Sequence, residues 1–154
     1  MPEGPEIRRA ADALSDAIAG LSIDHVRLPY HRRRPFGPRF RGQRIKAFRT
    51  HGKALLTDFD NGWTIYSHNQ LYGLWQVARP NDPLLPGRAL RLELGHQDRC
   101  IRLYSATDIS LWRTQNVAQH PFLSRLGPDI LDPILTPEAL VARLQSTRFQ
   151  NQSL

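Results

Sequence analysis

The first residues of the chain could supply a nucleophile. The sequence opens MPEGPEI. If an aminopeptidase removes Met1, Pro2 becomes the terminal residue and exposes a secondary amine. An unperturbed α-amino group has a pKa of about 7.7 to 8.0, so a useful fraction is unprotonated near neutral pH. Such an amine can attack an aldehyde-like carbon to form a positively charged iminium. Because an iminium withdraws electrons, a neighbouring phosphate could then leave by elimination.

Two glutamates accompany this amine. Glu3 is adjacent to Pro2 and could give or take a proton in the same reaction. Glu6 lies three residues further on, at the expected start of a helix. There it could orient reacting groups, or it could simply stabilise the positive end of the helix dipole. Both interpretations of Glu6 stay open on the residues alone.

The charge of the chain predicts a polyanionic partner. Lys and Arg number 21 against 14 Asp and Glu, which gives a net charge of +7. Only Lys46 and Lys53 are lysines. Lys53 stands in the turn-like run HGKALL, where it could be a functional cation or merely the end of a hairpin. The run YHRRRPFGPRFRG predicts an exposed basic loop, whose candidate phosphate contacts are Arg32, Arg33 and Arg34. Ordinary solvated surface is the alternative.

An amphipathic helix is expected to follow the candidate nucleophile. Over residues 5–19 the apolar side chains recur at helical spacing, as at Ile7, Leu14 and Ile18. Pro5 suits the first helical position, and Gly20 supplies the end. The helix therefore leads the domain and sets the direction in which the chain enters it.

Short strands make up most of the rest. A first candidate strand, SIDHVRL, precedes seven runs rich in branched and aromatic residues: QRIKAFRT, KALLTDF, WTIYSH, GLWQVAR, RALRLELG, RCIRLYS and DISLWR. Turn signals separate them, the clearest being Asp60-Asn61-Gly62. This spacing predicts a mainly β fold with flanking helices, an antiparallel β-sandwich led by the N-terminal amphipathic helix. We expect this domain over residues 1–125, with a linker and the start of a helical region over 126–154.

Several classes of protein are disfavoured. A single cysteine, Cys100, excludes a disulfide or a thiolate zinc site within these residues and is expected to be a buried apolar side chain. No hydrophobic run approaches the length that spans a membrane, and the first residues lack the apolar segment of a signal peptide. We therefore expect a cytoplasmic protein without a membrane partner.

Four runs together carry a resemblance to a known family: MPEGPEI, HGKALL, YSHNQLYG and LGPDIL. In this order they resemble the amino-terminal half of the formamidopyrimidine-DNA glycosylase family, in its endonuclease VIII branch. The start PEGPE and the contiguous QLY favour this pyrimidine-specific branch over the purine-specific one. The resemblance implies a base-excision repair enzyme that removes oxidised pyrimidines and then cleaves the strand by β,δ-elimination. Its partner would be double-stranded DNA with oxidised bases or abasic sites, with no obligate protein partner.

The resemblance also implies roles for individual residues. Pro2 corresponds to the Schiff-base nucleophile, Glu3 to the proton donor that opens the sugar, and Glu6 to a supporting acidic position. Lys53 corresponds to a lysine that donates a proton and contacts phosphate. The turn THGK differs from the expected RGK, at the cost of one basic contact.

The stretch YSHNQLYG would supply the wedge of the family. Gln70, Leu71 and Tyr72 correspond to residues that enter the double helix when the damaged nucleotide is flipped out. Filling the void in this way recovers part of the few kcal/mol that unstacking costs. Without the resemblance, LYGLW would be interpreted as a strand edge with a core leucine, and His68 as a structural histidine.

Family members continue into a helix-two-turn-helix module and a four-cysteine zinc finger. We therefore expect these residues to be an N-terminal fragment with no cofactor of its own, since zinc would belong to the C-terminal part. Weak or no glycosylase activity is expected, with residual lyase activity on abasic sites. Two alternatives remain: a non-catalytic basic DNA-binding module, and a tautomerase that uses the same terminal amine.

Overall fold

One helix, eight strands and one short 3₁₀ helix make up the part of the chain that the computed structural model describes, which is residues 4–29, 40–121 and 123. The elements are α1 (Gly4–Ile18), β1 (His25–Arg27), β2 (Ile45–His51), β3 (Ala54–Phe59), β4 (Trp63–His68), β5 (Leu74–Ala78), β6 (Leu90–His96), β7 (Arg99–Tyr104), β8 (Asp108–Arg113) and η2 (Thr114–Gln119). Every expected strand is present. The predicted linker and start of a helical region over 126–154 lie outside the described residues.

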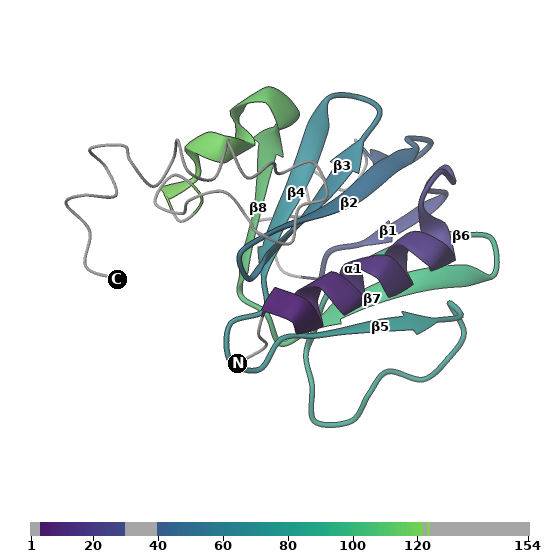
Figure 1. Ribbon diagram of the computed structural model, residues 1–154. Helices are drawn as coiled ribbons and strands as arrows, with labels where there is room; N and C mark the ends of the chain where they lie inside the picture. The colour runs from purple at the N-terminus through teal and green to yellow at the C-terminus, as the bar shows by residue number, and fades with distance from the viewer. Residues whose placement is uncertain (1–3, 30–39, 122, 124–154) are drawn as a thin grey trace, which may run out of the picture.

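The strands form two antiparallel sheets. One has the order β1-β6-β7-β5 and the other the order β2-β3-β4-β8. Figure 1 shows them as two layers, with α1 lying along the front between them. The predicted turn at Asp60-Asn61-Gly62 joins β3 to β4, and Gly62 adopts the left-handed backbone (φ 83°) that such a turn requires. The antiparallel sandwich led by a helix is therefore confirmed.

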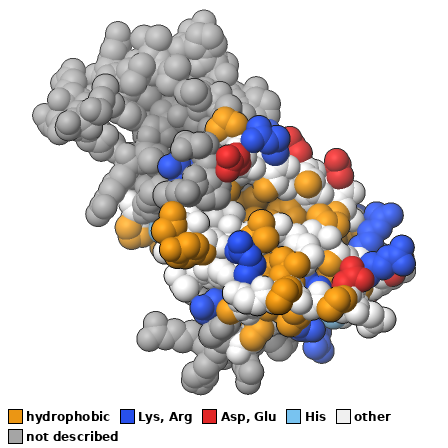
Figure 2. Space-filling view, turned by 90° about the horizontal axis from the view of Figure 1, so that it is seen from below, with side chains coloured by type: hydrophobic (Ala, Val, Ile, Leu, Met, Phe, Trp, Pro, Cys, Tyr) orange, Lys and Arg blue, Asp and Glu red, His pale blue; other side chains and the backbone are white. Residues whose placement is uncertain are grey.

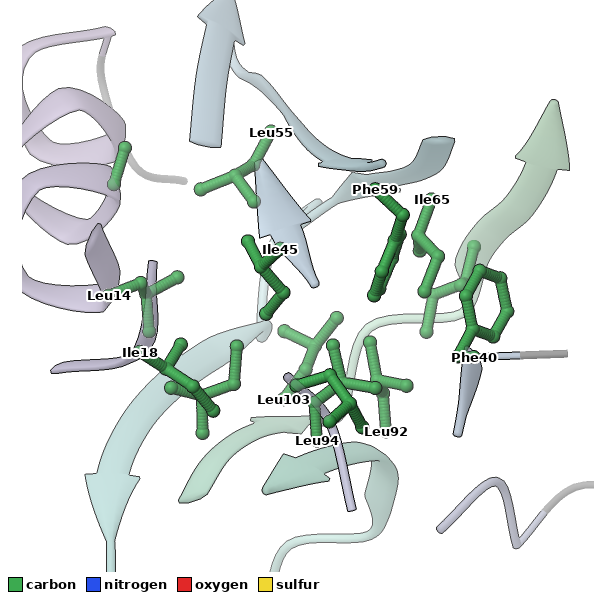
Figure 3. Packing of buried hydrophobic residues seen from close by; sticks show 14 of the residues in the cluster. Leu14, Ile18, Phe40, Ile45, Leu55, Phe59, Ile65, Leu92, Leu94 and Leu103 are labelled. Atoms are coloured by element: carbon green, nitrogen blue, oxygen red, sulfur yellow. The ribbon is translucent and has the colours of Figure 1, made fainter. Parts of the chain in front are cut away.

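The helix contributes a full face to the main core. Ile7, Ala11, Leu14 and Ile18 are each at most 2% exposed and pack against apolar side chains of both sheets. Figure 3 shows Leu14 and Ile18 on the helix side of this cluster, with Ile45 and Leu103 between the layers. Full burial of one such aliphatic side chain contributes about 1.5 to 3 kcal/mol, so this face anchors α1. The helix ends before Gly20 (φ 82°), as predicted.

Part of the outer face of the β2-β3-β4-β8 sheet is covered by the segment that follows β8. A second cluster of buried side chains lies there and joins the sheet to the segment after β8. Its members are Ala54, Leu56, Tyr66, Val117 and Leu123, with Trp112 packed against them. The chain after β8 therefore folds back over this sheet.

On the outer face of the β1-β6-β7-β5 sheet, a buried ion pair binds the connection between β5 and β6. Arg102 on β7 is 0% exposed, and its Nε donates to the Glu93 carboxylate on β6 at 2.6 Å. The same guanidinium donates to four backbone carbonyls of the β5–β6 connection, those of Arg79, Pro80, Asp82 and Pro83. A single arginine thus fixes residues 79–83 across this sheet.

Two further expectations concern buried and apolar residues. Cys100 is 0% exposed, as expected for an apolar core residue, and burial raises the pKa of its thiol to about 11. In the described part of the chain, no helix has the length and apolar character needed to cross a membrane.

Candidate nucleic-acid interface

Lys53 lies at the tip of a tight hairpin. The β2–β3 register pairs His51 with Ala54, which leaves Gly52 and Lys53 as the two turn residues. Gly52 has a φ of 61°, the left-handed value that the first position of a two-residue hairpin turn favours in glycine. The Lys53 side chain is half-buried at this tip. Its ammonium group is therefore held at one end of the sandwich.

The connection from β4 to β5 comes out at the same end. Ala54 pairs with His68 at the last position of β4, so the next residues lie beside the Lys53 turn. Gly73 N donates to the Asn69 carbonyl at 2.8 Å and closes a short turn over residues 69–73. A Cβ on Gly73 would lie 2.4 Å from that carbonyl oxygen, so only glycine fits.

This β4–β5 turn presents an apolar and an aromatic side chain to solvent. Leu71 is 59% exposed and Tyr72 is 70% exposed. We call these two residues the Leu71–Tyr72 tip. Figure 2 shows hydrophobic side chains on one face of the molecule, with both basic and acidic side chains among and around them. Exposed apolar side chains beside cations suit a polyanion that also offers stacked rings.

The start of α1 belongs to this end as well. Arg8 Nη1 donates to Thr50 Oγ1 near the end of β2 at 3.3 Å, whereas Gly20 N donates to the Ile45 carbonyl at the start of β2. The helix therefore runs antiparallel to β2, and its first turn lies beside the hairpin that carries Lys53 (Figure 1). Glu6 occupies that first turn and is exposed.

A neutral imidazole lies beneath the turn. His68 is buried, and its Nδ1 accepts a hydrogen bond from Gln70 N at 3.0 Å. Burial lowers the pKa of His68, nearby Lys53 and His120 lower it further, and Asp108 opposes them. The ring is therefore uncharged at neutral pH, and accepting at Nδ1 assigns its proton to Nε2. Burial and Asp108 likewise raise the pKa of Tyr66, which keeps this phenol neutral.

The candidate residues divide into two groups. Glu6, Lys53 and the QLY residues of the β4–β5 turn come together at one end of the sandwich. Pro2 and Glu3, and the loop arginines Arg32, Arg33 and Arg34, lie outside the described residues. Within the described part, no group of three His, Cys, Asp or Glu side chains could hold a metal ion.

One alternative interpretation of LYGLW is wrong in part. The strand it predicted exists, because β5 begins at Leu74 and forms the edge of its sheet. Neither leucine belongs to the core, since Leu71 is 59% and Leu74 37% exposed. The turn that Gly73 permits carries Leu71 away from the sheet.

Sequence reasoning missed two residues that bond to the turn. Arg88 Nη1 donates to the Tyr72 carbonyl at 2.7 Å, and Thr107 Oγ1 donates to Gln70 Oε1 at 2.7 Å. Both come from other loops. No local pattern marks them, because each contact depends on how distant strands pair.

Comparison with known proteins identifies the family of the chain. Residues 1–107 match the family model described as the formamidopyrimidine-DNA glycosylase N-terminal domain. The chain is 49% identical over 152 residues to proteins named Endonuclease 8 from Shigella flexneri and from Salmonella typhimurium (strain SL1344). These alignments cover 99% of this chain and 58% of each relative. The chain thus spans somewhat over half the length of these relatives.

Solved structures share the fold. A complex of Lactococcus lactis Fpg with DNA that contains an abasic site superposes with a TM-score of 0.73 at 20% identity, covering 82% of this chain and 50% of that one. A complex of MutM with DNA containing carbocyclic 8-oxo-G gives a TM-score of 0.72 at 20% identity, covering 82% and 51%. At this identity the likeness concerns the fold. The family match over residues 1–107 shows that the chain belongs to the formamidopyrimidine-DNA glycosylase family.

Proposed function

We propose that this chain is the catalytic domain of a bifunctional DNA glycosylase and AP lyase that acts on oxidised pyrimidines in double-stranded DNA. The main support is that the start of α1, the Lys53 turn and the Leu71–Tyr72 tip lie together at one end of the sandwich. The 49% identity to proteins named Endonuclease 8 supports the pyrimidine branch. The net charge of +7 supports a nucleic-acid partner.

The proposed chemistry begins at the amine of Pro2. Its lone pair forms a bond to the sugar carbon that carries the damaged base, the base leaves with the electrons of the broken bond, and the proton lost from the amine neutralises the departing base. Glu3 gives a proton to the ring oxygen, so the sugar opens and an iminium forms. Loss of a proton from the adjacent carbon turns the iminium into an enamine, whose electrons then expel the 3′ phosphate and restore the iminium. A second elimination releases the 5′ phosphate.

The residues that the structure describes would position the DNA and supply charge near the reacting groups. The ammonium of Lys53 lies at a hairpin tip, where it can contact a backbone phosphate or donate a proton. The first-turn carboxylate of Glu6 supports the entry of the chain into α1. Leu71 and Tyr72 are free to enter the space that a flipped nucleotide leaves, because both are mostly exposed.

Borohydride trapping tests this proposal directly. The purified chain is mixed with a duplex that contains an abasic site, and an imine intermediate is reduced to a stable adduct that mass spectrometry locates. We expect an adduct at Pro2 that disappears in Pro2→Gly. A Glu3→Gln variant should slow its formation while the affinity for DNA is kept.

The same experiment distinguishes a catalytic domain from a module that only binds DNA. If the chain loses Met1 and binds DNA but forms no adduct, the catalytic proposal is wrong and a non-catalytic DNA-binding module is the better description. Binding that is salt-dependent and indifferent to Pro2→Gly would identify such a module. An adduct on a different residue would also overturn the assignment of Pro2.

A further inference from the structure

We propose that Thr107 and Arg88 are positioning residues that hold the Leu71–Tyr72 tip in the shape in which it enters DNA. This inference rests on the proposed function, since it concerns how the tip is prepared for insertion. Neither residue belongs to the tip or to the proposed reacting groups. Each acts through a hydrogen bond to the β4–β5 turn.

Thr107 holds the first half of the turn. Its hydroxyl donates to Gln70 Oε1 at 2.7 Å, and its backbone N–H donates to the same oxygen at 3.2 Å. Gln70 has a φ of 55°, in the left-handed region that residues other than glycine seldom adopt. Such a conformation persists only when its surroundings hold it. The two bonds from Thr107 supply that restraint through the side chain of Gln70.

Arg88 holds the second half. Its Nη1 donates to the Tyr72 carbonyl at 2.7 Å. Its charged guanidinium is a stronger hydrogen-bond donor than a neutral group would be. The backbone on the far side of the tip is thereby fixed relative to the start of β6.

The two tethers are joined to each other. Ser105, two residues before Thr107, donates its backbone N–H to the Ala89 carbonyl at 2.8 Å. Ala89 directly follows Arg88. The connections β4–β5, β5–β6 and β7–β8 therefore form a closed circuit of hydrogen bonds around the tip, and movement of one loop would disturb the other two.

This circuit matters because the tip has little packing of its own. Leu71 and Tyr72 are 59% and 70% exposed, so apolar contact does not fix them. Ordering a mobile segment on binding costs free energy. A turn that is ordered before it meets DNA avoids much of that cost, and insertion becomes faster.

The first test measures the free chain by NMR, with backbone ¹⁵N order parameters for residues 70–73. Thr107→Val removes the hydroxyl at nearly constant volume, and Thr107→Ser is the matched control that keeps it. We expect rigid values of about 0.85 in the wild type and in Thr107→Ser, and values below about 0.6 in Thr107→Val. Arg88→Met should loosen the turn and Arg88→Lys should restore it. Unchanged order in Thr107→Val and Arg88→Met would overturn the proposal.

The second test measures insertion. The probe is a duplex with 2-aminopurine beside a stable tetrahydrofuran analogue of an abasic site, whose fluorescence rises as the stack opens. We expect Thr107→Val and Arg88→Met to slow this rise about tenfold, equivalent to about 1.4 kcal/mol. Trapping on single-stranded abasic DNA should stay unchanged, because it needs no insertion. A role in overall stability would lower both signals equally and would contradict the proposal.

The two proposals fail in different ways. If the wild type traps no abasic DNA, the proposed function is wrong, while the order parameters still decide whether Thr107 and Arg88 hold the turn. If trapping succeeds and the stack opens at the wild-type rate in Thr107→Val, the positioning role is wrong. If Arg88→Met reduced the slope of log binding constant against log salt by about one, Arg88 would be a phosphate contact. That result would overturn its assignment as a positioning residue.

Discussion

Arg102 and Glu93 form an ion pair with both side chains at most 1% exposed, and Arg102 Nε lies 2.6 Å from Glu93 Oε2. Taking two charges out of water is costly, and the remaining donors of Arg102 offset part of this cost through the carbonyls of residues 79–83. His25 Nε2 and Arg27 Nε lie 3.4 Å and 3.8 Å from the same carboxylate. The pair is the centre of the polar layer outside the β1-β6-β7-β5 sheet.

Removal of one partner should therefore be severe. We expect Arg102→Met or Glu93→Gln to lower the free energy of unfolding by about 3 to 5 kcal/mol, because a buried charge loses its partner. Urea unfolding followed by tryptophan fluorescence measures this. The control is Arg44→Met, whose pair with Asp60 is 4.0 Å long and exposed, and which should cost less than about 1 kcal/mol.

The same pair predicts coupling. The double variant Arg102→Met/Glu93→Gln should be less destabilised than the sum of its parts, since neither charge is then left alone. Arg102→Met should also speed proteolysis between residues 79 and 83, because those carbonyls lose their donor. Strict additivity of the two substitutions would contradict the importance of the ion pair.

The lowered pKa of His68 predicts a loss of stability in mild acid. An unfolded histidine has a pKa of about 6.5, and burial places the folded value below it. Between these two pKa values the unfolded chain binds a proton that the folded chain does not. The contribution of His68 to the free energy of unfolding is therefore fully present above about pH 6.5 and is lost as the pH drops towards the folded pKa. Burial lowers the pKa of His120 in the same way.

This dependence can be assigned to one residue. His68→Asn keeps an acceptor for Gln70 N and removes the titration, so its free energy of unfolding should fall less between pH 7.5 and pH 5.5 than that of the wild type. NMR titration of the His68 ring checks the direction independently. A pKa at or above 6.5 would show that Asp108 outweighs burial and would reverse the prediction.

Gly73 should tolerate no side chain, because the obstacle is backbone. A Cβ there would lie 2.4 Å from Asn69 O and 2.6 Å from Asn69 Cα, so the β4–β5 turn would have to open. We expect Gly73→Ala to lower stability by about 1 to 3 kcal/mol and to reduce opening of the base stack in the 2-aminopurine assay. Gly95→Ala is the comparison, since the atoms nearest to its Cβ belong to the His25 ring, a side chain that can swing away. If Gly95→Ala reduced opening of the base stack more than Gly73→Ala did, the predicted role of Gly73 would be wrong.

The fold was predictable because its signals are local. Burial of Ile7, Ala11, Leu14 and Ile18 follows from a spacing visible within one helix, and each strand follows from a short apolar run. The hairpin at Asp60-Asn61-Gly62 needs only three residues. Elements of this kind depend little on what lies elsewhere in the chain.

The architecture of the site was predictable only in part. Lys53 stood out as one of only two lysines, and Leu71 and Tyr72 stood out only through the family resemblance. That they share one end of the sandwich follows from the pairing of Ala54 with His68. The bonds from Thr107 to Gln70 and from Arg102 to the carbonyls of residues 79–83 join segments with no common pattern. Side chains that donate to distant groups leave no periodic trace, so they become visible only when the sheets are assembled.

The two lysines offer the sharpest test of where DNA lies. Lys53 and Lys46 sit at opposite ends of β2, so Lys53→Gln and Lys46→Gln make the same change in charge at different places. If the end that carries the tip faces DNA, Lys53→Gln should reduce the slope of log binding constant against log salt by about 0.9, and Lys46→Gln should leave it near the wild-type value. Lys53→Arg should keep the slope, because it keeps the charge, and should still slow borohydride trapping, because a guanidinium is a poor proton donor. Fluorescence anisotropy from 50 to 200 mM salt gives the slopes. Equal slopes for the two glutamine variants would mean that DNA does not contact this end of the sandwich more closely than the other.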